Sequence, residues 1–371
     1  MSISTTDSSR LDQDHMTLAI GLACRGLGNA WPNPAVGCVL VRDGRVVGRG
    51  WTQPGGRPHA EAEALSRAGE AARGATAYVS LEPCSHQGRT PPCADALIEA
   101  GVARVVVAHG DPDPRVAGAG IKRLREAGIT VTEGIRSDEA ARGLGGYLSR
   151  TLRSRPEVTL KLATSLDGRI ATTTGESKWI TGPVARDFGH GLRLRHDAII
   201  VGIGTALADD PELTCRLPGG DIRPAARIVL DNEGRFDANS KLARSTEEGP
   251  VWLILGEGAT PPKGLSGDIE VIYVPRTQQR RPDLAAVVGA CAARGVNRLL
   301  VEGGGIFAGA MARERLIDRL YWFRAGITIG DDGLPGVGEI GLPALSSALR
   351  FRLERRWVLD GDVVESWATA R

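Results

Sequence analysis

Aromatic side chains and net charge are both scarce in this 371-residue sequence. Phe, Trp and Tyr make up 4% of it, which argues against a surface on which single-stranded bases would stack. The 46 basic and 44 acidic residues leave a formal charge of +2, so no positively charged face for nucleic acid is indicated. No apolar run approaches the roughly 18 residues that a membrane-spanning helix requires. We therefore expect no nucleic-acid partner and no membrane partner.

Cysteines are few, and their spacing is not that of a disulfide framework. Six occur, at positions 24, 38, 84, 93, 215 and 291. The first 15 residues are polar and of mixed charge, unlike a signal or transit peptide. We therefore expect a cytoplasmic protein in which the thiols that bind no metal stay reduced and buried.

One imidazole and two thiols fall in a pattern typical of catalytic zinc. His59 opens an H-x-E motif, and Cys84 and Cys93 follow a buried apolar run at 77–81. Three protein ligands leave the fourth tetrahedral position of zinc for a water, whose pKa the metal lowers to about 7. Glu61 is placed to move protons, as the non-ligand glutamate does in the zinc nucleobase deaminases. The motif therefore predicts hydrolytic deamination with Glu61 as general acid and base.

The spacing of the two cysteines leaves a second interpretation open. Eight residues separate Cys84 from Cys93, whereas the nucleobase deaminases usually have two. A structural zinc site would need a fourth protein ligand, which His86 could supply. The H-x-E motif favours the catalytic interpretation.

The alternation of apolar and polar segments predicts two α/β domains in a chain of this length. We expect a disordered segment at 1–12, a first domain at 13–150 and a second at 151–371. The Arg- and Gly-rich stretch 139–155 marks their boundary. The predicted elements of the first domain are a helix at 14–26, a hairpin at 36–48, helices at 60–72, 94–100 and 120–127, and strands at 77–81, 104–108 and 129–132. Those of the second are strands at 158–163, 198–202, 226–230, 251–255, 269–274 and 298–301, and a helix at 306–315.

Two glycine turns in the second half suggest a phosphate site. Residues 302–305 lie between the strand at 298–301 and a helix, and residues 202–205 follow another strand. Backbone N–H groups at such a helix start attract phosphate, although the spacing is not a dinucleotide fingerprint. Candidate side chains for the same phosphate, which could equally be solvated on a helix face, are Arg186, Arg193, Arg195 and Arg216.

Longer motifs resemble the bifunctional deaminase/reductase family of riboflavin biosynthesis. In the first half these are residues 32–37, 59–61, 82–93 and 111–120; in the second half they are 161–171, 175–181, 208–216 and 301–304. The resemblance implies a cytidine-deaminase-like three-layer α/β/α domain followed by a dihydrofolate-reductase-like α/β domain. The first would use zinc to deaminate a diaminopyrimidinone carrying a ribosylamino 5′-phosphate. The second would use NADPH to reduce the ribosyl group to ribityl.

The resemblance also implies roles for individual residues. Zinc would be held by His59, Cys84 and Cys93, with Glu61 catalytic. NADPH would contact Ala163, Trp179, Thr205, Asp209, Gly304, Gly305, Ile306, Phe307, Ala308 and Gly309. The reductase substrate would contact Ser177, Arg193, Leu213, Arg216 and Glu302. We expect Asn33 and Arg89 to hold the base and phosphate of the deaminase substrate, and the chain to form a homo-oligomer (dimer or tetramer).

The sequence departs from the family's pattern at two places. The stretch 324–330 lacks a proline that often follows the last apolar strand, and glycines at 143–146 replace an Asn-containing segment. An alternative is therefore a deaminase with a decayed or assembly-only reductase domain. Two further alternatives are a deaminase of nucleic-acid bases and a zinc-stabilised binding protein. For the proton of the reductase step, Asp209, Glu302 and Lys161 are unranked candidates.

Overall fold

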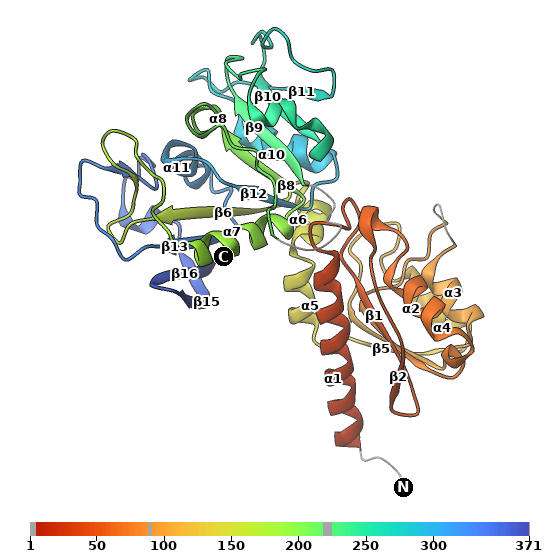
Figure 1. Cartoon of the computed structure of the whole chain (residues 1–371). Helices are drawn as coiled ribbons and strands as arrows, with labels where there is room; N and C mark the ends of the chain where they lie inside the picture. The colour runs from red at the N-terminus through yellow and green to blue at the C-terminus, as the bar shows by residue number, and fades with distance from the viewer. Residues whose placement is uncertain (1–4, 88–90, 218–224, 371) are drawn as a thin grey trace. The chain divides into compact units, whose positions relative to one another are not determined.

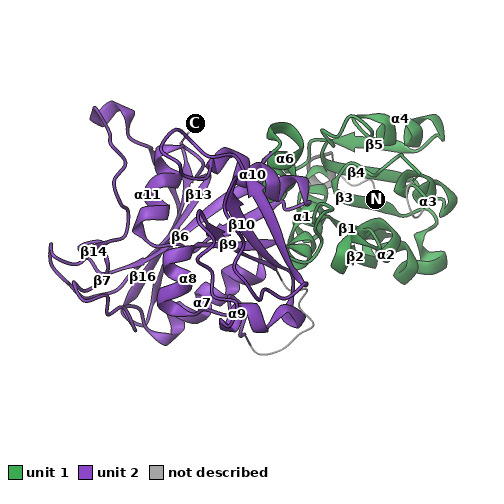
Figure 2. Ribbon diagram, turned by 90° about the horizontal axis from the view of Figure 1, so that it is seen from above, with its two compact units in different colours: residues 1–154 green, residues 155–371 purple. Residues whose placement is uncertain are grey.

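The chain forms two compact units in a computed structural model that describes residues 5–87, 91–217 and 225–370. Unit 1 is Met1–Ser154 and unit 2 is Arg155–Arg371 (Figure 2). Each unit encloses its own buried apolar side chains, with Leu40 and Leu97 among those of unit 1 and Ile254 and Leu299 among those of unit 2. Among the described residues, no helix combines the length and the hydropathy that crossing a membrane requires.

Unit 1 is a five-stranded sheet with helices on both faces (Figure 1). The strand order is β2-β1-β3-β4-β5, with β1, β2 and β3 antiparallel neighbours and β3, β4 and β5 parallel. The strands are β1 (Gly37–Arg42), β2 (Arg45–Trp51), β3 (Thr76–Leu81), β4 (Arg104–His109) and β5 (Thr130–Glu133). The helices are α1 (Thr5–Ala23), α2 (Ala60–Ala68), α3 (Cys93–Glu99), α4 (Ala119–Glu126), α5 (Ser137–Gly143) and α6 (Gly145–Arg153). This is the predicted three-layer arrangement, and the predicted hairpin turns at Asp43-Gly44, where both φ angles are positive.

The N-terminal segment corrects one expectation. Residues 1–4 lie outside the described part of the chain, but α1 begins at Thr5, so the segment 1–12 is not disordered throughout. Asp12 is buried and accepts hydrogen bonds from the Arg104 guanidinium (2.8 and 2.7 Å) and from the Tyr78 hydroxyl (2.8 Å). These partners lie on β3 and β4, far away in sequence, so the polar composition of the segment could not reveal them.

The stretch 139–155 is also more ordered than its glycine content indicates. It carries most of α5 and all of α6, and Leu144 and Tyr147 join the apolar core of unit 1. Burial of these side chains outweighs the low helix propensity of glycine, which costs about 1 kcal/mol per residue.

Unit 2 is built on a nine-stranded sheet in the order β11-β10-β9-β8-β12-β6-β13-β16-β15. The strands from β11 to β13 in this order are parallel, and β16 and β15 are antiparallel to their neighbours. Their bounds are β6 (Glu157–Thr164), β8 (Ala198–Gly202), β9 (Ala226–Asp231), β10 (Val251–Gly256), β11 (Ile269–Val274), β12 (Arg298–Val301), β13 (Arg319–Arg324), β15 (Phe351–Leu359) and β16 (Asp362–Thr369). The short strands β7 (Arg169–Ala171) and β14 (Leu334–Pro335) pair separately. The helices are α7 (Pro183–Leu194), α8 (Ile203–Asp209), α9 (Lys241–Arg244), α10 (Leu284–Ala293) and α11 (Gly305–Arg313).

A buried histidine joins β6 to the end of α7. Nδ1–H of His196 donates to the Leu192 carbonyl (2.6 Å), and Nε2 accepts from the Thr159 hydroxyl (2.9 Å). Burial, reinforced by the charge of Arg298, lowers the pKa of His196 to about 3. The imidazole is therefore neutral in the folded protein at any pH near 7.

We expect this histidine to make unit 2 less stable in mild acid. The unfolded chain protonates His196 below its ordinary pKa of 6.5, whereas the folded protein binds that proton only near pH 3. The stabilisation is thus complete above pH 6.5 and declines by about 1.4 kcal/mol per pH unit below it. Thermal unfolding at about pH 7 and about pH 5 checks this expectation. Between these two pH values the melting temperature of His196→Gln should fall by less than that of the unsubstituted protein. Equal losses in both proteins would contradict it.

Candidate functional site

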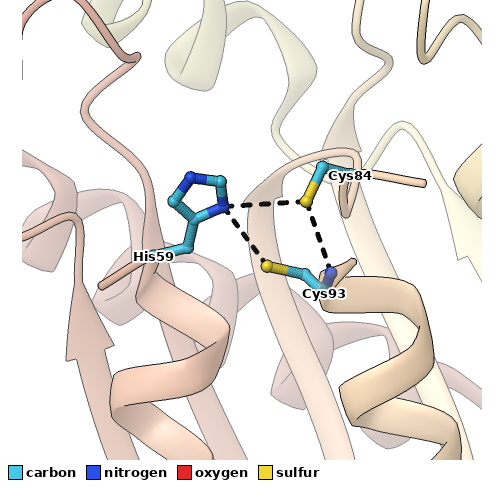
Figure 3. A group of neighbouring side chains, drawn as sticks. All are labelled: His59, Cys84 and Cys93. Carbon is cyan, nitrogen blue, oxygen red and sulfur yellow. Dashed lines mark hydrogen bonds between the residues drawn. The ribbon is translucent and has the colours of Figure 1, made fainter. Parts of the chain in front are cut away.

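Three metal-ligating side chains converge at one end of the unit 1 sheet (Figure 3). His59 immediately precedes α2, Cys84 lies in the loop after β3, and Cys93 is the first residue of α3. The ligand atoms all lie within 4.8 Å of one another, with His59 Nδ1 3.7 Å from Cys84 Sγ and 3.3 Å from Cys93 Sγ. Tetrahedral zinc with bonds of the usual lengths would set such N to S separations at about 3.6 Å. The donor set and its spacing therefore fit one zinc ion.

The protonation of this group suits metal binding. Hydrogen bonds from the Cys93 thiol and from His59 lower the pKa of Cys84 to about 4, so Cys84 is a thiolate near neutral pH. The neighbouring thiolate and burial raise the pKa of Cys93, which keeps its proton until a metal displaces it. A thiolate is the form of cysteine that binds zinc.

Glu61 lies in the first turn of α2, and only 3% of it is exposed. Burial raises its pKa to about 7, with the charge of Cys84 adding to the shift. A carboxyl group with a pKa near the working pH can both accept and return a proton. The position and pKa of Glu61 therefore suit acid and base catalysis.

Two expectations concern side chains near the metal group: Asn33 was expected to hold the substrate base, and His86 was the possible fourth ligand of a structural zinc site. Asn33 Nδ2 donates to the Gly56 carbonyl (2.9 Å) and lies 3.2 Å from His59 Nε2, on the side of the ring away from the sulfur atoms. Among the described residues the metal group has three members, and His86, the fourth ligand of the structural-zinc alternative, is not one of them. Arg89 lies outside the described residues.

A second polar cluster lies at the end of β12 in unit 2. Arg193 of α7 binds Glu302 through both carboxylate oxygens (Nε–Oε1 2.8 Å, Nη2–Oε2 3.0 Å), and its Nη1 donates to the Thr214 carbonyl (2.8 Å). Lys161 Nζ lies 4.0 Å from Glu302 Oε2. Burial opposes ionisation of Glu302, but the charges of Arg193 and Lys161 outweigh it and lower its pKa to about 2. Glu302 is therefore an ionised carboxylate, although only 11% of its side chain is exposed.

His190 is a further member of this cluster, and it was not predicted from the sequence. His190 lies three residues before Arg193 on α7, and its Nδ1 accepts a hydrogen bond from the Arg216 N–H (3.4 Å). Burial and the charges of Arg193 and Arg216 lower the pKa of His190. The i, i+3 spacing of a histidine and an arginine on one helix face was the available signal.

The glycine turn before α11 is only partly open. Gly304 N–H donates to Thr205 Oγ1 (3.2 Å), and Ile306 is 82% exposed. A Cβ on Gly305 would lie 2.1 Å from the Pro335 carbonyl oxygen, and one on Gly309 would lie 2.8 Å from Gly338. That face of the helix therefore packs against the chain's own segment 335–338. Phe307 and Ala308 are buried in the core of unit 2.

The remaining predicted cofactor residues vary in exposure. Trp179 is 67% exposed, with the Arg186 guanidinium 4.6 Å from its ring centre. Asp209 ends α8, exposed and 3.9 Å from Lys178 Nζ. Ala163 is half-buried on β6.

The predicted substrate residues of unit 2 do not all form one group. Arg193 and Glu302 are paired, whereas Arg216 is exposed beside Glu212 (3.5 Å). Leu213 is buried with a positive φ of 56°, and Ser177 is half-buried before Trp179. Among these predicted residues, Arg193 and Glu302 thus form the more enclosed charged contact, with 15% and 11% of their side chains exposed, and Arg216 is the more accessible cation.

Comparisons with known proteins cover both units. Residues 9–109 match the family described as the cytidine and deoxycytidylate deaminase zinc-binding region, and residues 156–364 match the RibD C-terminal domain. The chain is 40% identical over 354 residues to the riboflavin biosynthesis protein RibD of Escherichia coli, covering 92% of this chain and 95% of that protein. It is 42% identical over 331 residues to RibD of Haemophilus influenzae, covering 85% and 86%.

Solved structures extend the likeness to the fold. Acinetobacter baumannii RibD superposes with a TM-score of 0.88 at 38% identity, covering 98% of this chain and 100% of that one. A diaminohydroxyphosphoribosylaminopyrimidine deaminase/5-amino-6-(5-phosphoribosylamino)uracil reductase from Thermotoga maritima gives 0.85 at 32%, with the same coverage. These matches confirm the predicted order of a deaminase-like domain followed by a reductase-like domain.

Proposed function

Since this chain belongs to the RibD family of bifunctional riboflavin-biosynthesis enzymes, we propose that its two units act in turn on one phosphorylated pyrimidine. Unit 1 is a zinc-dependent deaminase and unit 2 an NADPH-dependent reductase. The substrate of the first step is 2,5-diamino-6-(ribosylamino)pyrimidin-4-one 5′-phosphate, and the second step turns its ribosyl group into ribityl. The observation that carries the proposal is the convergence of three zinc-ligand atoms beside the buried Glu61.

In unit 1, His59 Nδ1 and the sulfur atoms of Cys84 and Cys93 would hold the zinc ion. When bound, zinc supplies an activated water at the carbon that carries the amino group. As the water oxygen bonds to this carbon, Glu61 takes one proton from it and delivers that proton to the ring nitrogen. Glu61 then takes the second proton from the same oxygen and delivers it to the amino nitrogen, so the C–N bond breaks, ammonia leaves and the carbonyl group remains. Its burial excludes bulk water from this transfer. Asn33 contacts the pyrimidine base, and Arg89 the phosphate.

In unit 2, NADPH would supply a hydride to C1′ of the sugar. The C1′–O4′ bond breaks, and O4′ takes a proton, which leaves an open ribityl chain and NADP⁺. Glu302 is a poor source of this proton because Arg193 and Lys161 keep it ionised. Asp209 is exposed and faces Lys178. Lys161 carries three donor protons beside the buried carboxylate, so we assign the proton to Lys161.

In unit 2 we assign the binding residues from the exposure of their side chains. Arg216 is exposed and binds the ribose phosphate, while Arg193 orients the site through its hydrogen bonds to Glu302 and Thr214. Ser177 and Leu213 border the same substrate. The residues around the cofactor are Ala163, Trp179, Thr205, Asp209, Gly304 and Ile306, with backbone atoms from Gly305, Phe307, Ala308 and Gly309.

One reaction mixture tests the proposed sequence of steps. Zinc-loaded protein, NADPH and the diaminopyrimidinone substrate are combined, and ammonia release and NADPH oxidation are followed together. We expect equal amounts of both, with NADPH oxidation lagging because deamination comes first. Ammonia without NADPH oxidation would instead favour the alternative of a deaminase with an inactive reductase domain. Absence of both signals would contradict the whole assignment.

We further propose a cytoplasmic location and assembly as a homodimer or homotetramer. Free thiols at all six cysteines suit a reducing compartment. Leu345 and Val358 of unit 2 are large apolar side chains exposed in the single chain, which suits a contact between copies. Light scattering on the purified protein should give a mass of two or four chains, and a monomer at micromolar concentration would contradict this.

A further inference from the structure

A buried carboxylate that is neither a metal ligand nor the acid and base lies beside the metal group. Glu82 follows β3 directly, and only 4% of it is exposed. Its Oε2 accepts the N–H groups of Asp111 (3.2 Å) and Gly118 (3.0 Å), and its Oε1 those of Gly120 (3.0 Å) and Ile121 (3.3 Å). An ionised carboxylate has about four acceptor positions and no donor. All of them are used by backbone atoms of the segment 111–121.

The segment 111–121, whose N–H groups bind Glu82, also contacts the loop that contains Cys84. Glu82 is two residues before Cys84, and a Cβ on Gly120 would lie 2.0 Å from the Pro83 carbonyl oxygen. The first turn of α4 therefore touches the backbone immediately before the ligand. No side chain larger than hydrogen fits at that contact without moving one of the two segments.

Helix α4 also reaches the other cysteine. Arg123 donates to the Ser85 carbonyl (3.3 Å), one residue after Cys84, and forms an ion pair with Asp95. Asp95 lies in the first turn of α3, which begins at Cys93. Helix α4 thus contacts the chain before and after Cys84, and it also contacts α3, the helix that begins at Cys93. Glu82 in turn binds the start of α4.

We propose that Glu82 is a positioning residue for the metal centre: by fixing the start of α4 against the Cys84 loop, it sets the separation of the Cys84 and Cys93 sulfur atoms. This inference rests on the proposed zinc site. Zinc tolerates ligand positions only within a few tenths of an ångström, so a loosened loop weakens binding and misplaces the activated water. A glutamine at this position keeps the shape but offers one acceptor oxygen, and its amide group would face N–H donors.

The test uses Glu82→Gln in the full-length, zinc-loaded protein. Transfer of zinc to a chromogenic chelator should be at least about tenfold faster than in the unsubstituted protein, and kcat for deamination should fall by about 10- to 100-fold. Reduction of the deaminated substrate by the same molecules should not change, because unit 2 does not contain this contact. A second variant, Gly120→Ala, pushes on Pro83 from the other side of the contact and should release zinc faster too.

A matched control separates positioning from general stability. Asp12→Asn weakens another multiply bonded carboxylate of unit 1. Its partner Arg104 begins β4, whereas the loop with Cys84 follows the opposite end of β3. This variant should lower the melting temperature without accelerating zinc release. Native zinc release in both Glu82→Gln and Gly120→Ala would overturn the proposal, as would equally fast release from Asp12→Asn. If the unsubstituted, zinc-loaded protein failed to deaminate, the proposed function would fail, while the zinc-release comparison would still decide the role of Glu82.

Discussion

Substitution of Glu61 by glutamine is expected to lower deamination by about 10²- to 10⁴-fold, which is the usual contribution of a general acid and base. Glutamine fills the same buried space but cannot accept and return a proton. Zinc content should remain near one ion per chain, because His59, Cys84 and Cys93 are untouched. Ammonia release at saturating substrate, with zinc determined on the same sample, measures both quantities.

The neighbouring Glu63 provides the control for Glu61. It lies on the same helix two residues further on, but it is partly exposed and paired with Arg67. Glu63→Gln should deaminate at close to the native rate. NADPH oxidation with the deaminated substrate should be unaffected in both variants, since it belongs to unit 2. A Glu61→Gln protein that releases ammonia at the native rate would refute the assignment of Glu61.

Substitution of Arg193 by glutamine is expected to lower the reductase rate at neutral pH by about 10²-fold or more. Removal of one partner leaves the Glu302 carboxylate buried with only Lys161 and, when protonated, His190 to offset its burial. The pKa of Glu302 should therefore rise from about 2 toward or above the ordinary value of 4.5. The Thr214 carbonyl loses its donor as well, which loosens the segment that precedes Arg216.

The pH profile distinguishes this effect from simple misfolding. In the unsubstituted protein Glu302 stays ionised down to about pH 2, so it contributes no loss of activity on the acid side of neutrality. In Arg193→Gln, kcat/KM for NADPH oxidation should fall as the pH drops through the raised pKa. Arg195→Gln, an exposed arginine at the end of the same helix, is the control and should keep the native profile. Unchanged ammonia release in both variants would show that unit 1 is intact, and a native profile in Arg193→Gln would contradict the role of the pair.

The zinc site was predictable because its chemistry is local in the sequence. His59 and Glu61 lie two residues apart at the start of one helix, and Cys84 and Cys93 flank one loop after a recognisable strand. Strand ends and helix starts of an α/β sheet lie along one edge, so these four side chains could be placed together without coordinates. Most strands followed from apolar patterns in the same way, but of the eleven α-helices in the described chain only five, α1 to α4 and α11, were predicted.

The geometry of the polar cluster in unit 2 could not be predicted from the sequence. Arg193 and Glu302 were identified one at a time by resemblance, but 109 residues separate them, and nothing between them indicates a bidentate pair. The same limit hid the contacts of Asp12, which order the N-terminal helix, and those of Tyr147, which order α6. Each depends on a partner brought close only by the packed sheet.

The sequence by itself therefore predicted the zinc ligands and the acid and base, and it determined the order of the two domains and the net charge of only +2. Only the tertiary structure decided what each charged group contacts: Glu302 contacts Arg193 and Lys161, and Glu82 binds the backbone of 111–121. The physical reason is that residue type and short spacing fix what a side chain can do. Burial and long-range partners decide whether it is ionised, where it points and what it holds in place.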